Sequence, residues 1–214
     1  GHREFRLAVN YALNRDELVT YIRKSIGKGA HRGFLPAGMP GYDSIMVEGY
    51  HHDPEKAREL LRGIDYNGEE VELLVADQYK ELANYIQRQL KEVGVNVKVD
   101  AVTKSVHRQS MASFQSNFFL KNWTGDFADA TNFYQLFYSK NFAPENGPNY
   151  CHFSSAEYDQ NFEQLLKETN DSAKWEIYNN LERILHDEAP IVPLFYDQTV
   201  RFYQKNVTGI KANS

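Results

Sequence analysis

The 214-residue sequence has one cysteine, Cys151, so no internal disulfide framework stabilises it. It has no apolar run that approaches the roughly 18 residues of a membrane-spanning helix. Acidic residues outnumber basic ones by 29 to 24, and the net charge of −5 argues against nucleic acid as a main partner. Charged residues are 25% of the chain, which does not indicate disorder. What remains is a globular fold large enough to be stable without disulfides or metals.

Enzyme motifs are also missing. The chain has no G-x-S-x-G elbow, no Walker loop, no G-x-G-x-x-G and no H-E-x-x-H. Cys151 and His152 are adjacent, whereas a nucleophile and its base normally meet through the fold. The run His51-His52-Asp53 suggests a metal site, but an Asp before Pro54 is typical of a helix cap. We therefore predict no catalytic residue, no metal and no cofactor, with a hydrolase or metalloenzyme built on these two runs as the alternative.

A βαβ unit is the clearest pattern present. Val71–Ala76 predicts a strand, Gln78–Val93 predicts a helix ended by Gly94, and residues 95–99 alternate as a second strand. Two strands joined by a helix within about 30 residues are parallel, with a right-handed crossover.

The remaining elements complete one mixed α/β domain over residues 1–214, a mixed sheet flanked by helices. Residues 4–26 are predicted to be helical, with Asn14 and Glu17 as a capping pair for a second helix through Ile26. Further helices are predicted from Pro54 to Leu61, over 101–116, over 131–138, from Ser154 (capped with Glu157) to Glu168, and from Asn170 or Asp171 onward. Further strands are predicted over Asn117–Trp123, Ile191–Tyr196 and Thr199–Gln204. In the last helix the residues expected to face inward are Trp175, Tyr178, Leu181, Ile184 and Leu185.

The segment Asn122–Asp129 is the candidate binding site. Asp126 follows a predicted strand and a glycine, where strand ends in α/β sheets face a ligand crevice. An acid beside Trp123 suits an ammonium group, through ion pairing and cation–π contact. An Asx-turn at Asp126 with Trp123 in the core is the structural alternative.

Four segments together resemble a known family. They are Phe5–Arg15 (FRLAVNYALNR), Tyr50–Leu61 (YHHDPEKARELL), Ile86–Val97 (IQRQLKEVGVNV) and Trp123–Asp129 (WTGDFAD). In this order and spacing the chain resembles the C-terminal (second) lobe of the oligopeptide/dipeptide-type solute-binding proteins of ABC importers, family 5. The resemblance covers essentially the whole chain.

The resemblance implies one lobe of a two-lobed, periplasmic-binding-protein type II-like clamp, and we expect the first lobe to be absent from this sequence. It implies a receptor that is not an enzyme, located in the periplasm or as a cell-surface lipoprotein. The implied ligand is a di- or oligopeptide, delivered to ABC permease subunits in the membrane, and we expect this fragment to be monomeric.

In this family the Asp of a W-x-x-D-Y-x-D-P signature pairs with the peptide's α-ammonium group. That role passes by resemblance to Asp126, with Trp123 lining the site and Phe127 beside it. The chain departs from the signature at Phe127, which replaces Tyr, and at Ala130, which replaces Pro. The alternatives left open are a sensing or regulatory protein that uses the same lobe, and a receptor for a sugar, nickel chelate, haem or opine.

Overall fold

The βαβ unit forms one end of the protein. The computed structural model describes residues 2–198, 204, 206 and 207. Strands β2 (Val71–Ala76) and β3 (Val97–Val102) pair in parallel, with Val71 opposite Val97 and Ala76 opposite Val102. A 3₁₀ turn, η3 (Asp77–Tyr79), and helix α4 (Lys80–Glu92) connect them. The predicted unit is therefore confirmed, and the predicted α/β class with it.

Three helices near the N-terminus and one after β3 complete this half. They are α1 (Arg3–Ala12), α2 (Arg15–Glu17), which continues into a π-helical turn η1 (Leu18–Ile22), α3 (Pro54–Gly63) and α5 (Lys104–Ala112). The apolar faces of α1, α3 and α4 meet β2 and β3 in a first hydrophobic core, whose fully buried members include Ala8, Leu18, Ala57, Leu73, Val75 and Leu90. The alternation and the 3.6-residue period seen in the sequence produce this core.

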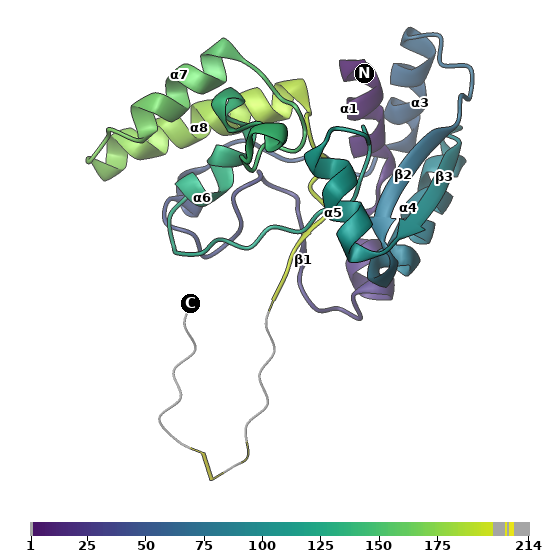
Figure 1. Ribbon diagram of the computed structural model, residues 1–214, viewed down its shortest axis with the longest axis horizontal. Coiled ribbons are helices and arrows are strands. Elements are labelled where there is room, and N and C mark those ends of the chain that lie inside the picture. Colours follow the sequence, from purple (N-terminus) through teal and green to yellow (C-terminus); the bar gives the residue numbers. More distant parts are fainter. Residues whose placement is uncertain (1, 199–203, 205, 208–214) are drawn as a thin grey trace.

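A second core lies in the helical half. Its elements are α6 (Thr131–Tyr134), η4 (Gln135–Phe137), η5 (Ser139–Asn141), η6 (Ala143–Glu145), α7 (Ala156–Leu165) and α8 (Asp171–Glu188). Its buried members include Leu35, Ile45, Tyr134, Phe137, Tyr158 and Leu181. Figure 1 shows the two halves beside each other, with α7 and α8 at the left and the βαβ unit at the right.

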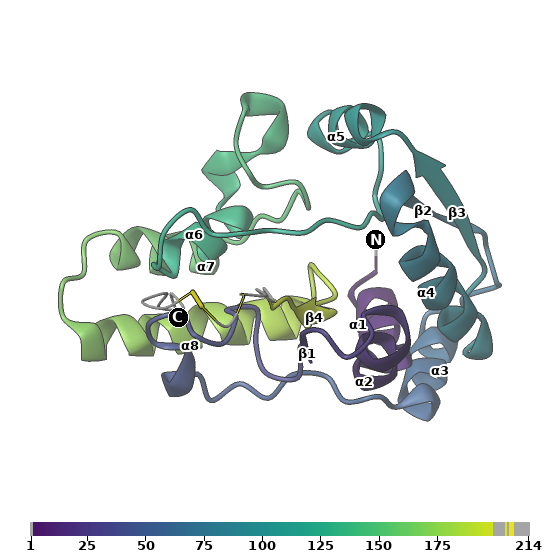
Figure 2. The same cartoon turned by 90° about the horizontal axis from the view of Figure 1, so that it is seen from below.

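A short antiparallel pair lies between the halves. Strand β1 (Lys28–Gly29) pairs with β4 (Phe195–Tyr196), and both appear between α8 and α1 in Figure 2. Among the described residues the strands thus form two separate two-stranded sheets rather than one mixed sheet. A 3₁₀ turn, η2 (Tyr42–Ser44), lies on the long loop between β1 and α3.

Several predicted boundaries are wrong. The helical region expected over residues 4–26 divides as predicted, with Asn14 capping the second piece by accepting a hydrogen bond from the Glu17 N–H, but that piece ends at Ile22 instead of Ile26. The helix expected over 101–116 starts at Lys104 because β3 runs on to Val102. The strand expected over Ile191–Tyr196 is limited to β4.

Two helix details also differ from the prediction. The cap of α7 is Ser155, whose hydroxyl accepts a hydrogen bond from the Tyr158 N–H, instead of Ser154. Trp175 does not face inward, because 42% of it is exposed on α8. Asn170 caps α8 as expected. The predicted strand Thr199–Gln204 lies, apart from Gln204, outside the described residues.

The predicted strand Asn117–Trp123 is reduced to a single parallel bridge between Phe119 and Leu74 of β2. Within the described residues no further strand pairs with its outer side, so the ladder does not extend.

The polar face of α1 joins the two halves. Arg6 donates hydrogen bonds to the carbonyls of Glu188 (2.6 Å) and Ala189 (3.0 Å), and Asn10 donates to that of Ile191 (3.1 Å). Arg3 similarly donates to the Asp187 carbonyl. These carbonyls belong to the end of α8 and the segment after it, where a helix leaves its last carbonyls without intrahelical partners.

Arg15 continues this set of contacts into the interior. Only 1% of it is exposed, and its guanidinium donates to the carbonyls of Pro193 (2.7 Å), Asn10 (3.0 Å), Leu13 and Tyr50 (both 3.3 Å). Burial lowers the pKa of Arg15 to about 10. Because its donors are saturated by backbone oxygens, the charge is held without a salt bridge to any described residue.

Glu182 is the corresponding buried acid in the helical half. Its carboxylate accepts hydrogen bonds from the N–H groups of Phe34 (2.7 Å) and Leu35 (2.9 Å) and from the Tyr134 hydroxyl (3.1 Å). Burial raises the pKa of Glu182, while these three donors oppose the rise. The loop that precedes η2 is thereby attached to α8.

No helix in the described ranges is both long enough and apolar enough to span a membrane.

Replacing Arg15 by Ala should lower the free energy of unfolding of this chain by about 3 kcal/mol or more, because it leaves several buried carbonyls without donors. Urea unfolding followed by tryptophan fluorescence measures the change. The exposed Arg62 of α3 is the control, and its replacement by Ala should cost less than about 0.5 kcal/mol. Equal losses in the two variants would show that Arg15 does not hold the halves together.

Glu182 predicts a pH effect on stability. Its pKa is higher in the folded than in the unfolded chain, so the stability from this group is fully present below its ordinary pKa. That stability is lost as pH rises through the raised pKa. The Glu182→Gln variant lacks this titration, so the free energy of unfolding of the wild type minus that of the variant should fall as the pH rises above the ordinary pKa of a glutamic acid. Urea unfolding at several pH values tests this, and a difference that grows with pH would contradict it.

Candidate functional site

The candidate segment leaves the sheet at the edge where its strands end. The Leu74 N–H donates to the Phe118 carbonyl and the Leu120 N–H donates to the Leu74 carbonyl, both at 3.0 Å. Residues 118–120 therefore run parallel to β2. From Lys121 the chain continues beyond the carboxyl edge of β2 and β3 and crosses to α6, as Figure 2 shows. Ligands of open α/β sheets bind at this edge.

The far end of the segment is held by polar contacts to α6. The Trp123 indole N–H donates to the Asn132 carbonyl at 2.8 Å. The Asn132 side-chain amide donates to the carbonyls of Phe127 (3.2 Å) and Asp129 (3.3 Å). Asp129 accepts from the backbone N–H (2.8 Å) and the hydroxyl (2.6 Å) of Thr131, which is the Asx-turn chemistry of a helix start.

Asp126 is exposed, and its carboxylate makes no hydrogen bond or ion pair with any described residue. The Asx-turn that sequence reasoning offered as its alternative role belongs instead to Asp129. Phe127 beside it is 64% exposed. Trp123 is half-buried and packs against the second core, so its ring is shared between the core and the surface.

The backbone between these anchors carries free donors. None of the N–H groups of residues 121–128 donates a hydrogen bond within the described part of the chain. An extended segment with unpaired amides can pair with another extended chain as an added strand.

The three residues predicted from the sequence, Asp126, Trp123 and Phe127, all lie on this segment. Lys121 lies on it too and was not among the predicted residues. The Lys121 ammonium group lies 3.8 Å from the centroid of the Tyr150 ring and 5.9 Å from that of Trp123. Partial burial and the nearby charge of Arg108 lower the pKa of Lys121. The sequence did contain a clue to this position. Lys121 lies two residues before Trp123, and side chains two residues apart in a strand-like segment lie on the same face.

The two alternative enzyme sites have little geometric support. Asp53 caps α3 by accepting from the Lys56 N–H at 2.9 Å, and no group of three or more His, Cys, Asp or Glu in the described residues is arranged to hold a metal. The Cys151 thiol donates to the Asn149 side-chain oxygen, and burial raises its pKa to about 11. His152 stacks on the Phe114 ring at 4.2 Å. The thiol is thus held in its neutral, unreactive form.

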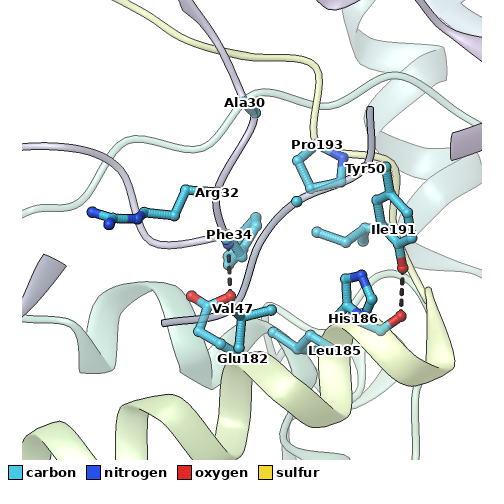
Figure 3. A pocket seen from close by; sticks show the side chains of 12 residues that line it. Ala30, Arg32, Phe34, Val47, Tyr50, Glu182, Leu185, His186, Ile191 and Pro193 are labelled. Carbon is cyan, nitrogen blue, oxygen red and sulfur yellow. Dashed lines mark hydrogen bonds between the residues drawn. The ribbon is translucent and has the colours of Figure 1, made fainter. Parts of the chain in front are cut away.

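A cavity of about 30 Å³ lies elsewhere, between α8 and the loop that precedes α3. Figure 3 shows Val47, Leu185 and Ile191 around it, with Glu182 bonded to the Phe34 backbone at its wall. Its volume suits about one water molecule and excludes a peptide. None of the predicted site residues lines it.

The family comparison covers two thirds of the chain. The family described as "Bacterial extracellular solute-binding proteins, family 5 Middle" matches residues 1–144. Among curated proteins, the chain is 25% identical over 212 residues to the dipeptide-binding protein of Escherichia coli (strain K12), covering 95% of this chain and 39% of that protein. It is 27% identical over 222 residues to the dipeptide-binding protein DppE of Bacillus subtilis (strain 168), covering 98% and 40%.

A third relative is the glutathione-binding protein GsiB of Escherichia coli (strain K12), 28% identical over 217 residues, covering 95% of this chain and 41% of that protein. The chain therefore spans about two fifths of the length of these relatives.

Solved structures share the fold. The periplasmic binding protein DppA of Helicobacter pylori, in complex with the peptide STSA, superposes with a TM-score of 0.84 at 22% identity, covering 92% of this chain and 38% of that one. OppA of Haemophilus influenzae, in complex with RPPGFSPFR, gives a TM-score of 0.81 at 21% identity, covering 91% and 39%.

The contacts of Asn132 predict how the segment is held. Replacing Asn132 by Ala removes its two hydrogen bonds to the segment and should lower the free energy of unfolding by about 1–3 kcal/mol, because Asn132 is buried. Hydrogen exchange at the amides of residues 129–133 should also quicken. Asn122, which is exposed on the same segment, is the matched control. If Asn122→Ala has the same effect on exchange, Asn132 does not position the segment.

Proposed function

Because the chain belongs to family 5 of the bacterial extracellular solute-binding proteins, we propose that it is the ligand-binding lobe of a receptor that captures peptides and delivers them to an ABC importer. The observation that carries the proposal is Asp126, an exposed carboxylate without a partner among the described residues, three residues after Trp123 on the segment that leaves the carboxyl edge of the sheet. Relatives named for dipeptides and glutathione support the ligand class.

In this proposal Asp126 pairs with the α-ammonium group of the peptide. The ion pair forms without breaking an existing contact, because Asp126 has no partner among the described residues. Trp123 and the exposed Phe127 provide aromatic surface beside it, which suits ligands whose side chains vary.

The free amides of residues 121–128 support a peptide over a sugar or a metal chelate. They lie on a segment outside the helices and strands that bends at residues 126–128, and those before the bend can pair with the backbone of a bound peptide. Backbone pairing gives affinity that does not depend on the peptide's sequence. A second lobe closing over the ligand would complete the enclosure, and hinge closure would signal occupancy to the permease.

The family is extracellular by its description. We propose in addition that the complete receptor is a periplasmic protein or a lipoprotein at the cell surface, that it acts as a monomer, and that it releases its ligand chemically unchanged rather than acting as an enzyme. A sensor that uses the same lobe would share the ligand chemistry and differ in its partner.

Native mass spectrometry of the complete receptor, purified gently from cells, tests the ligand class. We expect adducts with peptide masses on the wild type that are lost or strongly reduced in Asp126→Asn. For a defined peptide the variant should bind about 10- to 100-fold more weakly, the effect of one charge-assisted hydrogen-bonded pair.

Glu92→Gln is the matched control for the loss of one carboxylate. Glu92 is exposed at the end of α4, on the opposite edge of the parallel sheet from Asp126. Adducts of non-peptide mass would replace the proposed ligand class. Peptides retained equally by Asp126→Asn and by the control would move the ammonium site to another residue.

A further inference from the structure

The loop between β1 and α3 holds a large apolar side chain in solvent beside α8. Met46 of this loop is 81% exposed, the largest exposed fraction among the large hydrophobic residues in the described ranges. Trp175 of α8 is also exposed, although its place in the helix period predicted an inward position. Met and Trp are both enriched where proteins bind one another, because they supply large apolar contacts.

Polar contacts fix the loop against the turn of α8 that carries Trp175. Asn179, which follows Trp175 by one helical turn, accepts a hydrogen bond from the Met46 N–H (2.7 Å) and donates one to the Ser44 carbonyl (2.9 Å). A Cβ atom added at Gly41 would lie only 3.0 Å from the Trp175 ring, so the loop passes directly over this turn. Met46 and Trp175 therefore belong to one exposed surface, the Met46–Trp175 patch.

Acidic side chains border this patch. Glu48 is exposed two residues after Met46, in a stretch where exposed and less exposed residues alternate, so the two side chains point the same way. Asp171 is exposed one helical turn before Trp175, and Asp43 is exposed in η2. None of these three carboxylates forms a salt bridge within the part of the chain that the structure describes.

The basic groups nearby are fewer. Arg32 lies over the Tyr42 ring of the same loop, with its guanidinium carbon 5.4 Å from the ring centroid. Lys174 and Glu176 flank Trp175 along the chain with opposite charges. Four carboxylates against two basic groups leave the surroundings of the patch with a net negative charge.

This charge decides which partner fits the patch. An anionic membrane and the same face of a second copy are both negatively charged, so the bordering carboxylates disfavour them. We propose that the Met46–Trp175 patch docks a basic, apolar loop of the importer's membrane subunits. This inference rests on the proposed function. Met46 and Trp175 supply the apolar contact, and the carboxylates attract the basic loop and orient it.

Cysteine labelling of the complete receptor tests what covers the patch. The Met46→Cys variant should react rapidly with a maleimide in the receptor alone. With an excess of the importer's membrane subunits, reconstituted in nanodiscs of phosphatidylcholine, it should react about tenfold or more slowly. Cys151 gives little background, because burial raises the pKa of its thiol to about 11. Arg62→Cys on α3, at the other end of the protein in Figure 1, is the control and should label equally in both conditions.

Binding of the receptor to the same nanodiscs separates the apolar from the charged contribution. Trp175→Ala should weaken binding about tenfold or more, mainly through faster dissociation. The triple variant D43N/E48Q/D171N should associate several-fold more slowly at low salt, and the difference should largely vanish at about 0.5 M salt. The matched control is E69Q/E70Q/E92Q, which removes the same charge from exposed positions in the βαβ half and should associate faster than the first triple variant. Peptide binding should be unchanged in all of these variants.

The outcomes distinguish the possible occupants. Slow labelling of Met46→Cys in the receptor alone would mean that another part of the receptor covers the patch, and would overturn the assignment. Protection by nanodiscs without importer subunits would assign the patch to lipid, and protection that rises with receptor concentration alone would assign it to a second copy. Full-strength binding of Trp175→Ala and of D43N/E48Q/D171N to the importer would overturn only the patch. A wild-type receptor that binds peptide but no importer would contradict the proposed function itself.

Discussion

Hydrogen bonds from the polar face of α1, and from Arg15 at the start of α2, to the backbone carbonyls of residues 187–193 hold the two halves of the protein in place. Arg6, Asn10 and Arg15 donate to successive parts of that segment, so two regions more than 170 residues apart are joined along several contacts. The carbonyls at the end of α8 need partners, and donors on α1 supply them; Arg15 of α2 binds the carbonyl of Pro193 further along. The antiparallel pairing of β1 with β4 follows directly after this segment.

Each half of the protein contains a buried ionisable side chain that is surrounded by hydrogen-bond partners. Arg15 is surrounded by carbonyl oxygens and Glu182 by N–H and O–H donors, and in the described residues neither pairs with an opposite charge. Several short hydrogen bonds to one charged group offset the loss of hydration. They also specify the path of the loop between β1 and α3, which has little regular structure of its own.

The candidate site depends on this fixed frame. Its segment crosses between the halves, attached to β2 at Leu74 and to α6 through Asn132, and the backbone amides between the two anchors have no acceptor in the part of the chain that the structure describes. The ends give the segment a defined position, and the middle keeps its polar groups for a ligand. Asp126 lies on this middle part, so the carboxylate proposed to bind the ligand is positioned by contacts made at the two ends of the segment.

The sequence predicted correctly those helices and strands whose hydrophobic period, capping residue and terminating residue all lie close together in the chain. The strand at Val71–Ala76, the cap at Asp53 and the helix before Gly94 each follow from period, cap and breaker residues close together in the chain. The candidate segment with Asp126 and Trp123 was also accessible, from its place after a strand and from the family motif. The sequence alone did not identify Lys121 as part of this surface, because the Tyr150 ring that it packs against is distant along the chain.

Only the tertiary structure decided the rest. Asn117–Trp123 has the composition of a strand, yet it forms one bridge, because a ladder needs neighbours that local sequence cannot supply. The choice of Ser155 over Ser154 as a cap, and the exposure of Trp175, depend on how α7 and α8 pack. The burial of Arg15 and Glu182 is of the same kind: a charged residue predicts exposure until the fold surrounds it with backbone partners from distant segments.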